Sequence, residues 1–458
     1  MIQDKPKKLI IYELNEVPLK VLKEYVRTNP KSNFAQITKS GIVKETYTID
    51  EGELHPWSTW PTVHRGVSNN IHKIQFINQN LDYSRKWPPI WEILLKNKLT
   101  IGIFGSLQSY PPIKDNLVSF YLPDTFSPRP DSLPLNIMDF QRFNLAFTER
   151  NKAISRKIFL NDYLIFLKLI LKGNFKIDTI LSVLKHLFLE LYNPKNKSLR
   201  SLMQPILGFD IYFKLLEKEK PHFSTFFTNH VAGMMHRYWK YAFPEDFKST
   251  KTKNFHNKSI KKAMKIADKQ VGKLLKFCES NNFELWIISS MGQEAILRDN
   301  DFPEIYLSKI DKVISSIGLN PSSYKLLPAM QPDLCINCKD QVSLSILLEN
   351  IQKIKDLNGV KIFKPRYKND GLNVNISIQH SLKAYKVQKF LIEGETFLAE
   401  DLNIEFVKRD IGTGYHSKKG IYIGYGNKSK KIFKSYKDKD IDTRDFFNKI
   451  KLYFGIKL

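Results

Sequence analysis

Residues 54–67, LHPWSTWPTVHRGV, are the most unusual stretch of this chain, and residues 69–72, NNIH, follow them closely. Within the segment, Thr59 is surrounded by two tryptophans, two prolines, two histidines and an arginine. If a helix begins here, its free N–H groups favour an anion close to the Thr59 hydroxyl, which predicts a nucleophile. The alternative is an ordinary helix start, with Ser58 or Thr59 as the N-cap and Pro61 in the first turn.

The length and composition of the chain indicate a large globular protein. It has 458 residues, of which 42% are hydrophobic and 12% aromatic, and these fractions exclude a disordered chain. A chain of this length can bury a large core, either as one α/β domain with insertions or as two domains.

The charge balance predicts attraction to anions. Lys and Arg number 72 against 46 Asp and Glu, a net charge of +26. Such a charge favours nucleic acid, acidic lipid surfaces, or phosphorylated and sulfated substrates. The excess of basic residues is spread along the chain and consists mostly of Lys, so a dedicated nucleic-acid site is not predicted. An anionic small molecule, or a glycan or lipid ester, is the expected partner, with peripheral membrane contact as an option.

The cysteines and the first residues predict a cytoplasmic location, free or at the inner face of the membrane. Three Cys in a chain of this length form no disulfide framework. Cys335 and Cys338 have the spacing of half a zinc or redox site, but no second pair exists, and the alternation around them favours a strand. Residues 5–8, KPKK, lead into a strand without an apolar leader.

Apolar runs alternate with helical segments along most of the chain. The runs at 9–14, 99–105, 223–229 and 285–288 predict buried parallel strands, each with polar residues where it ends. Helices are expected between them at 17–25, 87–96, 206–218 and 259–280. This order predicts a three-layer α/β/α sandwich with a mostly parallel central sheet.

Two stretches interrupt this rhythm and are predicted to be insertions. Residues 127–202 contain apolar helical segments at 160–171 and 177–192, punctuated by charges, and neither offers the ~20 uncharged residues of a membrane span. They predict a helical cap, or alternatively a cap that rests on a membrane. Residues 301–395 predict a small α/β insertion. The core is then expected in three parts, 1–126, 203–300 and 396–458.

Thr59-Trp60-Pro61-Thr62, with His72 closing the segment, resembles the nucleophile loop of the alkaline phosphatase superfamily, in its type I phosphodiesterase and nucleotide pyrophosphatase branch. In that family a Thr followed by an aromatic residue and a Pro attacks phosphorus. A Gly that precedes the closing Ile in the family is missing here, where residues 69–72 read NNIH. The resemblance implies the alkaline-phosphatase-like fold and Thr59 as the nucleophile.

The same resemblance implies where metal ligands would lie. Asn15 stands at the position of a metal-binding Asp, flanked by Glu13 and Glu16, and His236 and His416 match two metal-binding histidines. Three other ligand positions are changed, to Ala232, Ser290 and Met291. Two metal ions about 4 Å apart need several anionic ligands, so the resemblance predicts one divalent metal, zinc or similar, or none. Packing against Trp239 is the alternative role of His236.

Three functions remain open at this point. The first is a hydrolase or transferase of a phosphate ester, phosphodiester or sulfate ester, with Thr59 as nucleophile and an incomplete metal site. The second is a metal-independent transferase of the same fold in glycan or lipid assembly, with His230 or His236 as general base and Arg65 or Arg237 holding an anion. The third is a catalytically dead binding homologue. The predicted substrate-binding residues are His55, His64, Arg65, Asn229 and Arg237.

Overall fold

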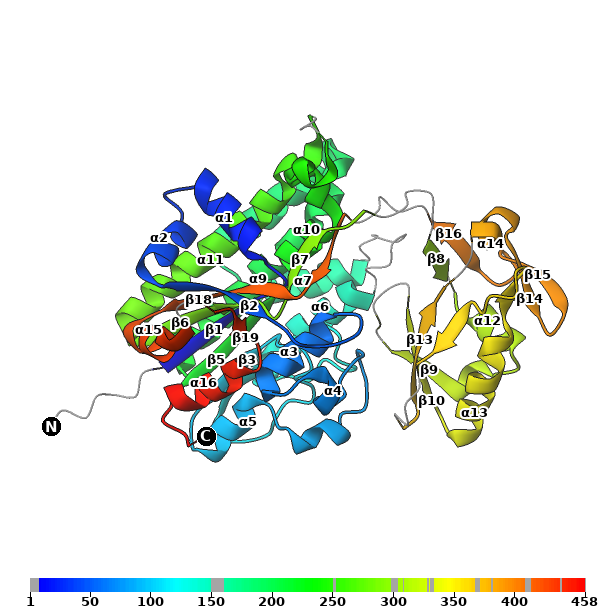
Figure 1. The fold of residues 1–458 in the computed structure, drawn as a ribbon, viewed down its shortest axis with the longest axis horizontal. Coiled ribbons are helices and arrows are strands. Elements are labelled where there is room, and N and C mark those ends of the chain that lie inside the picture. Colours follow the sequence, from blue (N-terminus) through cyan, green and yellow to red (C-terminus); the bar gives the residue numbers. More distant parts are fainter. Residues whose placement is uncertain are drawn as a thin grey trace.

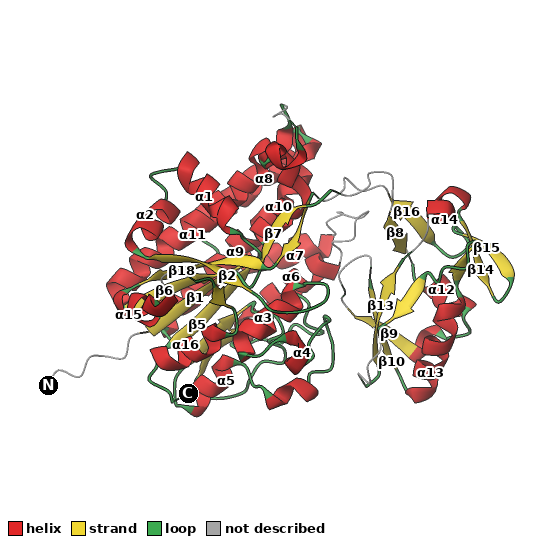
Figure 2. Cartoon of the chain, viewed as in Figure 1, coloured by secondary structure: helices red, strands yellow, loops and turns green. Residues whose placement is uncertain are grey.

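The computed structural model of the chain (Figure 1) describes residues 8–149, 160–249, 253–297, 304–307, 309–327, 329, 333–366, 371–379, 382–407, 413–436 and 439–457. Residues 5–7 of the basic N-terminal segment lie outside the described residues. Figure 2 shows a large body of helices around a central sheet and a smaller body of strands and helices beside it.

The large body is organised by an eight-stranded sheet with the order β19-β2-β18-β6-β1-β5-β3-β4. Only β18 runs antiparallel to its neighbours, so the sheet is mostly parallel, as predicted. The strands are β1 (Lys8–Leu14), β2 (Ile42–Tyr47), β3 (Ile101–Phe104), β4 (Val118–Leu122), β5 (Phe223–Thr228), β6 (Phe283–Ile288), β18 (Lys419–Tyr425) and β19 (Ile441–Asp442). The four strands predicted from the sequence are β1, β3, β5 and β6, and they lie side by side in this sheet.

Helices cover both faces of the sheet because β1 and its neighbours are apolar on both sides. Ile10, Tyr12 and Leu14 belong to one core, and Leu9 and Ile11 belong to another on the opposite face. The first core is covered by α1 (Leu19–Thr28), α2 (Asn33–Ser40), α9 (Met203–Glu219), α10 (His230–Ala242) and α11 (Ser259–Asn281), and the second by α3 (Pro56–Arg65), α5 (Ile90–Lys96), α15 (Asn427–Ile432) and α16 (Asp445–Tyr453). The result is the predicted three-layer α/β/α sandwich.

The first predicted insertion, residues 127–202, is helical. It contains α6 (Met138–Glu149), α7 (Leu160–Leu171) and α8 (Ile177–Tyr192), followed by the 3₁₀ turns of Pro194–Leu202. The two apolar segments predicted as helices therefore form α7 and α8 with the expected bounds. Among the described residues, none of the helices has both the length and the apolar character needed to cross a membrane.

The second interruption has a hydrophobic core of its own, formed by residues between Ile305 and Ile404. Its antiparallel sheet has the order β12-β13-β10-β9, and Cys335 and Cys338 lie on β10, which is a strand as predicted. The elements are β8 (Glu304–Leu307), α12 (Asp311–Ser316), β9 (Tyr324–Leu327), β10 (Leu334–Cys338), α13 (Gln341–Asn350), β11 (Lys355–Asp356), β12 (Phe363–Pro365), β13 (Asn373–Ile378), α14 (Leu382–Val387), β14 (Lys389–Ile392), β15 (Glu395–Leu398) and β16 (Ile404–Val407). The division of the chain into five segments stays a prediction.

A small two-stranded sheet joins the turn after β6 to the C-terminal part of the core. It pairs β7 (Gly292–Ala295) with β17 (Gly414–Ser417), and Gln293 lies opposite His416 in the register. This pairing brings the C-terminal histidine to the edge of the main sheet at which the parallel strands end.

Candidate functional site

Polar side chains gather where β1, β5 and β6 end. Asn15 and Glu16 follow β1, Asn229 follows β5, and residues 289–291 follow β6. Because these three parallel strands are neighbours, their carboxyl ends meet at one edge of the sheet, where ligands of open α/β sheets bind. This edge is the candidate functional site.

Glu16 meets two histidines at this edge. Its Oε2 lies 2.9 Å from His236 Nε2 and 3.5 Å from His416 Nε2. One ligand atom from each of the three residues lies within 4.8 Å of the others, a spacing that could hold a metal ion. His236 and His416 were predicted as ligands, whereas the carboxylate comes from Glu16 and not from the neighbouring Asn15.

The backbone around Gly414 sets the orientation of His236. His236 Nδ1 lies 2.9 Å from the Gly414 carbonyl, to which it must donate, so the tautomer is fixed and Nε2 faces Glu16. A Cβ at position 414 would lie 2.5 Å from the Met235 carbonyl oxygen. Glycine therefore permits β17 to approach α10 closely enough for this hydrogen bond.

Glu16 is held in an uncommon backbone conformation. Its φ is +60°, in the left-handed region that a residue other than glycine rarely adopts, and such strain is frequent at functional sites. Burial alone would raise the pKa of Glu16, but the charges of His416 and His236 and their hydrogen bonds hold it well below the ordinary value. Burial opposes the charged form of His416, yet Glu16 keeps the pKa of that imidazole above its usual value. The carboxylate is therefore ionised at neutral pH.

Two other observations support a ligand at this cluster. Gln293 Nε2 donates to Glu16 Oε2 and, at 3.2 Å, to the Ala232 carbonyl, but Gln293 Oε1 is buried without a hydrogen-bond partner among the described residues. The donor set of two imidazoles and one carboxylate is also typical of a divalent zinc-like ion. The residues present thus fit a metal.

Thr59 lies in the first turn of α3 and faces the turn after β6. Its Oγ1 is 2.8 Å from Ser290 Oγ. The next residue, Trp60, donates from Nε1 to Asn15 Oδ1 at 2.8 Å, and Asn15 Nδ2 in turn donates to Glu16 Oε1 at 2.8 Å and to Asn229 Oδ1 at 2.7 Å. Asn15 therefore connects the Thr59 helix to the Glu16 cluster and to Asn229.

The two sides of the site differ in exposure. The Thr59 and Ser290 side chains are fully buried, whereas the His236 side chain is 32% exposed and Asn229 is exposed. A ligand therefore has its access from the His236 and Asn229 side.

His64 and Arg65, which were predicted to bind substrate, have partners elsewhere. His64 Nε2 lies 2.7 Å from Glu13 Oε1 in a buried pair. The buried Arg65 guanidinium donates to the Ser84 and Trp87 carbonyls, and burial lowers the pKa of Arg65 to about 10. Both side chains brace α3 against its surroundings.

His230 and Arg237 also have nearby structural partners. His230 uses both ring nitrogens, Nδ1 toward Thr228 Oγ1 at 2.6 Å and Nε2 toward the Ala263 carbonyl at 3.0 Å, and burial lowers the pKa of His230 to about 4. Arg237 donates to the Gly233 carbonyl and to Ser201 Oγ. Neither residue contacts the Glu16 cluster through these bonds.

His55 and His72 mark the two ends of the Thr59 segment. His55, at the N-cap position of α3, stacks on Trp57 with ring centroids 4.4 Å apart and touches the His416 ring at 5.6 Å. His72, in α4 (Asn69–His72), accepts from the Ile74 N–H at 3.0 Å and therefore donates from Nε2 to Thr62 Oγ1, also at 3.0 Å. His55 is thus beside the cluster, and His72 stabilises α3.

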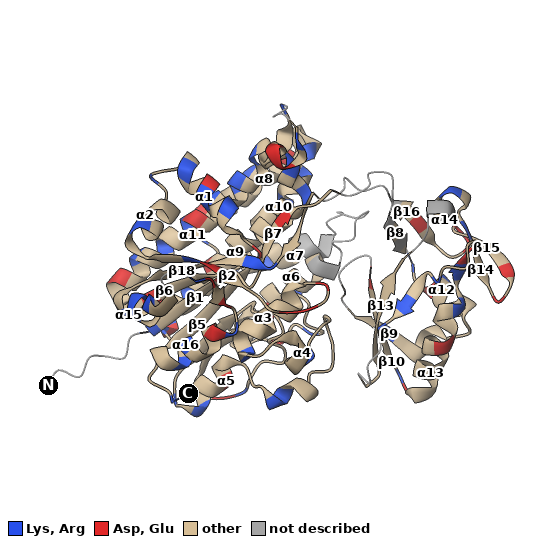
Figure 3. Ribbon diagram, viewed as in Figure 1, with Lys and Arg blue, Asp and Glu red and all other residues tan. Residues whose placement is uncertain are grey.

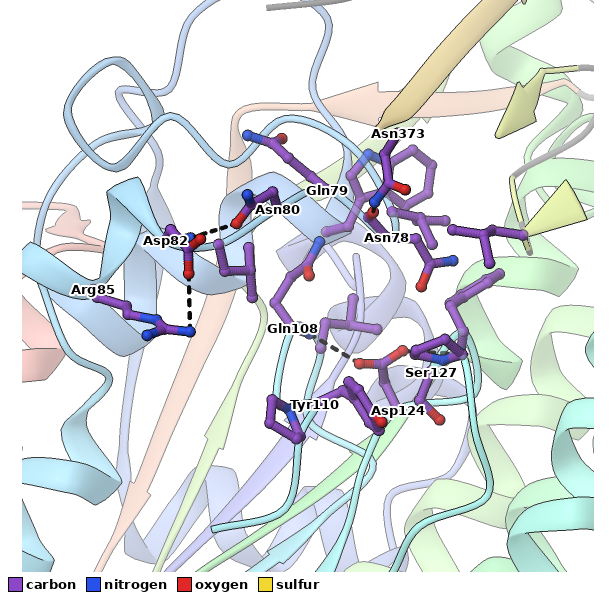
Figure 4. Close-up of a pocket in the computed structure, with 18 residues that line it drawn as sticks. Asn78, Gln79, Asn80, Asp82, Arg85, Gln108, Tyr110, Asp124, Ser127 and Asn373 are labelled. Carbon is purple, nitrogen blue, oxygen red and sulfur yellow. Dashed lines mark hydrogen bonds and ion pairs between the residues drawn. The ribbon is translucent and has the colours of Figure 1, made fainter. Parts of the chain in front are cut away.

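A cavity of about 270 Å³ lies beside Trp57, two residues before Thr59. Figure 4 shows the amides of Asn78, Gln108 and Asn373 around it, together with Tyr110 and Asp124. Asp124 accepts hydrogen bonds from the Gln108 and Phe126 N–H groups, and burial raises its pKa to about 6. Asn373 belongs to the small body, so both bodies line the cavity.

The sequence reasoning placed the metal ligand at Asn15 and named Glu16 only as a flanking carboxylate; it gave no role to Gln293, which donates to Glu16, and none to Ser290 as the partner of Thr59. Glu16 stood one residue from the predicted position, and the only available signal was its place directly after an apolar strand. Gln293 and Ser290 follow the next apolar strand, at 285–288, in the same way.

Comparison with protein-family models and with curated protein sequences gave no match. Among solved structures, the chain is similar to murine ectonucleotide pyrophosphatase/phosphodiesterase 5, with 12% identity, coverage of 98% of this chain and 96% of that one, and a TM-score of 0.41. It is also similar to phosphonoacetate hydrolase from Sinorhizobium meliloti in complex with phosphonoformate, with 10% identity, the same coverages and a TM-score of 0.43. These neighbours are members of the alkaline phosphatase superfamily, which the sequence motifs resemble.

Proposed function

We propose that this protein is a hydrolase or transferase that acts on a phosphate ester, phosphodiester or sulfate ester with the help of one divalent metal ion. The observation that carries the proposal is the meeting of Glu16, His236 and His416 where the parallel strands end. Two histidines and one carboxylate are a frequent ligand set of catalytic zinc, which keeps a further position for substrate.

One ion is proposed because the described residues contain no second group of three His, Cys, Asp or Glu ligands. The other positions at which the resemblance expects ligands hold Ala232, Ser290 and Met291, which supply no negative charge. Two closely spaced cations would not be neutralised by a single carboxylate.

Thr59 is the proposed nucleophile. Its Oγ1 would form a bond to phosphorus while the bond between phosphorus and the leaving alcohol breaks, and water or an acceptor alcohol would then release the phosphoryl group. Ser290, at 2.8 Å, orients the hydroxyl. A bound divalent ion would polarise the substrate oxygens and offset the charge that develops on them. Because Thr59 is fully buried, covering side chains must move before the substrate reaches it.

The surroundings suggest how a substrate would lie. The net charge of +26 favours an anion, and Asn229 offers an exposed amide beside the cluster. The cavity near Trp57 is lined by amides and by apolar side chains such as Leu107 and Phe126, so it would hold an alcohol part that offers both hydroxyl groups and apolar faces, such as a glycan. The charge favours the anionic group of such an ester, and the cavity favours its alcohol.

One observation favours a second candidate, a metal-independent transferase of the same fold. Glu16 Oε2 lies 2.9 Å from His236 Nε2, so the carboxylate would stabilise, without a cation, the imidazolium that forms when His236 takes a proton from an acceptor hydroxyl. In that case His236, which is partly exposed, is the proposed general base.

The experiment combines metal content with turnover. The purified chain should be assayed for zinc, manganese and iron, and then for hydrolysis of aryl phosphate, aryl phosphodiester and aryl sulfate before and after chelation. We expect about one ion per chain, activity that is lost on chelation, and loss of turnover in Thr59→Ala with the metal retained. Turnover that persists without metal would favour the second candidate. Absence of turnover on all three substrates, with or without metal, would argue against both.

The matched control for Thr59→Ala is Thr62→Ala, one turn along the same helix. Thr62 Oγ1 donates to Asp50 and receives a hydrogen bond from His72, so it holds the fold and not the site. We expect Thr62→Ala to lower stability and to retain turnover in the folded protein.

A further inference from the structure

Helix α8 exposes a continuous apolar stripe. Its members are Ile177, Leu181, Leu184, Phe188, Leu191 and Tyr192, with exposed fractions between 52% and 85%. The steps of four and three residues between the first five place them on one face of the helix. Large apolar patches of this kind are rare on proteins that do not use them for binding.

The opposite face of α8 packs against the rest of the protein. Thr179, Val183, His186 and Glu190 are buried there, and Val183 belongs to the core beneath the helix. Glu190 forms ion pairs with Arg200 and, at 3.0 Å, with His186. The inner face is therefore fixed, and the stripe cannot rotate inward to bury itself.

The preceding helix repeats the pattern. Leu164, Leu167 and Leu171 of α7 are between 51% and 79% exposed, again at steps of three and four residues. Figure 2 shows α8 in the upper part of the large body, above α10.

Exposed lysines lie on α8 and close to both of its ends. Lys176, Lys185, Lys195 and Lys197 are exposed on or next to α8, whereas Asp178 is the exposed acidic residue of this helix. Figure 3 shows the Lys and Arg positions around α8 within a chain of net charge +26. An apolar face with a Lys-rich border matches the arrangement of helices that lie on anionic lipid bilayers.

We propose that the α8 stripe is a docking surface for an anionic lipid bilayer, with the helix lying in the plane of the headgroups. At 1.5 Å per residue its 16 residues span roughly 24 Å, less than the ~30 Å hydrocarbon core, so the helix rests on the membrane and does not cross it. A second copy of the chain would bring the same lysines together, and their repulsion disfavours that occupant, whereas acidic headgroups attract them.

The test is co-sedimentation of the full chain with vesicles of phosphatidylcholine alone or mixed equally with phosphatidylglycerol. We expect binding to the mixed vesicles that weakens as salt is added, and little binding to phosphatidylcholine alone. The double variant Phe188→Glu/Leu191→Glu should reduce binding by about tenfold or more, because two of the most exposed apolar groups are lost and negative charge is added.

The matched control is Leu135→Glu/Val342→Glu, which changes two apolar residues that are 69% and 70% exposed away from the stripe. A second variant, Lys185→Gln/Lys195→Gln, keeps the apolar face and should weaken binding to the mixed vesicles by several-fold. Circular dichroism should show that all three variants are folded. Turnover of a soluble aryl ester should be unchanged in all three, so the result is independent of the proposed catalytic function.

Three results would overturn the proposal, two from the vesicle assay and one from sedimentation velocity. The first is the absence of binding by the unmodified chain to the mixed vesicles, and the second is an equal loss of binding in the Leu135/Val342 control. The third is a concentration-dependent dimer in sedimentation velocity that dissociates in the Phe188/Leu191 variant, without any vesicle binding. That outcome would assign the stripe to a second copy of the chain.

Discussion

Glu13 and Glu16 lie three residues apart at the end of β1 and have opposite surroundings. Glu13 is enclosed between His64 and Ser106, with Oε1 at 2.7 Å from the imidazole and Oε2 at 2.8 Å from the hydroxyl. Glu16 meets His236 and His416, and the His236 side chain is 32% exposed, against 5% for His64. A glutamate and histidine therefore form a buried structural pair at Glu13, whereas Glu16 and its two histidines form a cluster that is partly open to solvent.

This difference shows how structural and functional roles can be separated when the residue types are the same. A buried carboxylate with all its partners inside the protein braces the fold. A carboxylate shared by two histidines, one of them open to solvent, leaves donor atoms that a cation or substrate can reach. The predictions that follow test this separation, in order of expected effect.

The largest effect is expected from Glu16→Gln. Removing the negative charge should lower metal affinity by more than about 100-fold. This loss of affinity is larger than the one expected from changing a residue that only orients a metal ligand. Metal content per purified chain, measured by elemental analysis, should fall from about one ion to nearly none, and turnover should fall with it. Full metal content in this variant would show that the cluster is not the metal site.

Glu13→Gln should instead act on stability. Breaking a buried pair leaves His64 and Ser106 with a weakened partner, and we expect the free energy of unfolding to fall by about 3 kcal/mol. Urea denaturation measures this change. Metal content of the folded protein should stay the same, and a loss of metal comparable to that in Glu16→Gln would remove the distinction between the two glutamates.

The architecture could be predicted because it depends on local patterns. Apolar runs such as residues 9–14 and 223–228 are largely buried on both faces of a parallel sheet, and their alternation with amphipathic helices indicates the layers. The small antiparallel sheet around β10 was foreseen only in part, because its central pairing joins β10 to β13, which is distant in sequence.

The site could be predicted only in outline, since one backbone angle decides which residue points into it. The chain turns into the left-handed region at Glu16, and this turn brings the carboxylate of Glu16, and not the amide of Asn15, to the histidines. Likewise, the register of α3 directs His64 toward Glu13 and Arg65 toward the Ser84 and Trp87 carbonyls. Neither detail has a signature in residue types or spacing.

Acid should destabilise the protein because two of its histidines, His72 and His230, are buried. Burial lowers the pKa of His72 to about 3 and that of His230 to about 4, from an ordinary 6.5. Below pH 6.5 these histidines bind protons in the unfolded chain but not in the folded chain. Their contribution to the free energy of unfolding is therefore fully present above that pH and declines as the pH falls toward the folded pKa values.

We expect each of these histidines to lower the free energy of unfolding by roughly 1–2 kcal/mol between pH 7 and pH 5. Urea denaturation as a function of pH measures the decline, and His72→Gln should make it shallower whatever its effect at pH 7. Stability that is independent of pH over this interval would contradict the assignment of neutral, enclosed imidazoles.

The smallest effect is expected at the rim of the open cluster, where Arg366 of the small body lies 4.0 Å from Glu53. A hydrogen bond with His55 contributes most to the lowering of the Glu53 pKa to about 2, with a smaller contribution from the Tyr415 hydroxyl, at 2.6 Å, and a smaller one still from Arg366. A partly exposed ion pair with a separation of 4.0 Å contributes little, so Arg366→Ala should change the free energy of unfolding by less than about 0.5 kcal/mol. Tyr415→Phe, which removes the hydrogen bond, should cost about 1 kcal/mol. Urea denaturation compares the decrease in the free energy of unfolding between the two variants. A larger decrease in Arg366→Ala would show that the contact from the small body stabilises Glu53 more than the contact from Tyr415 does.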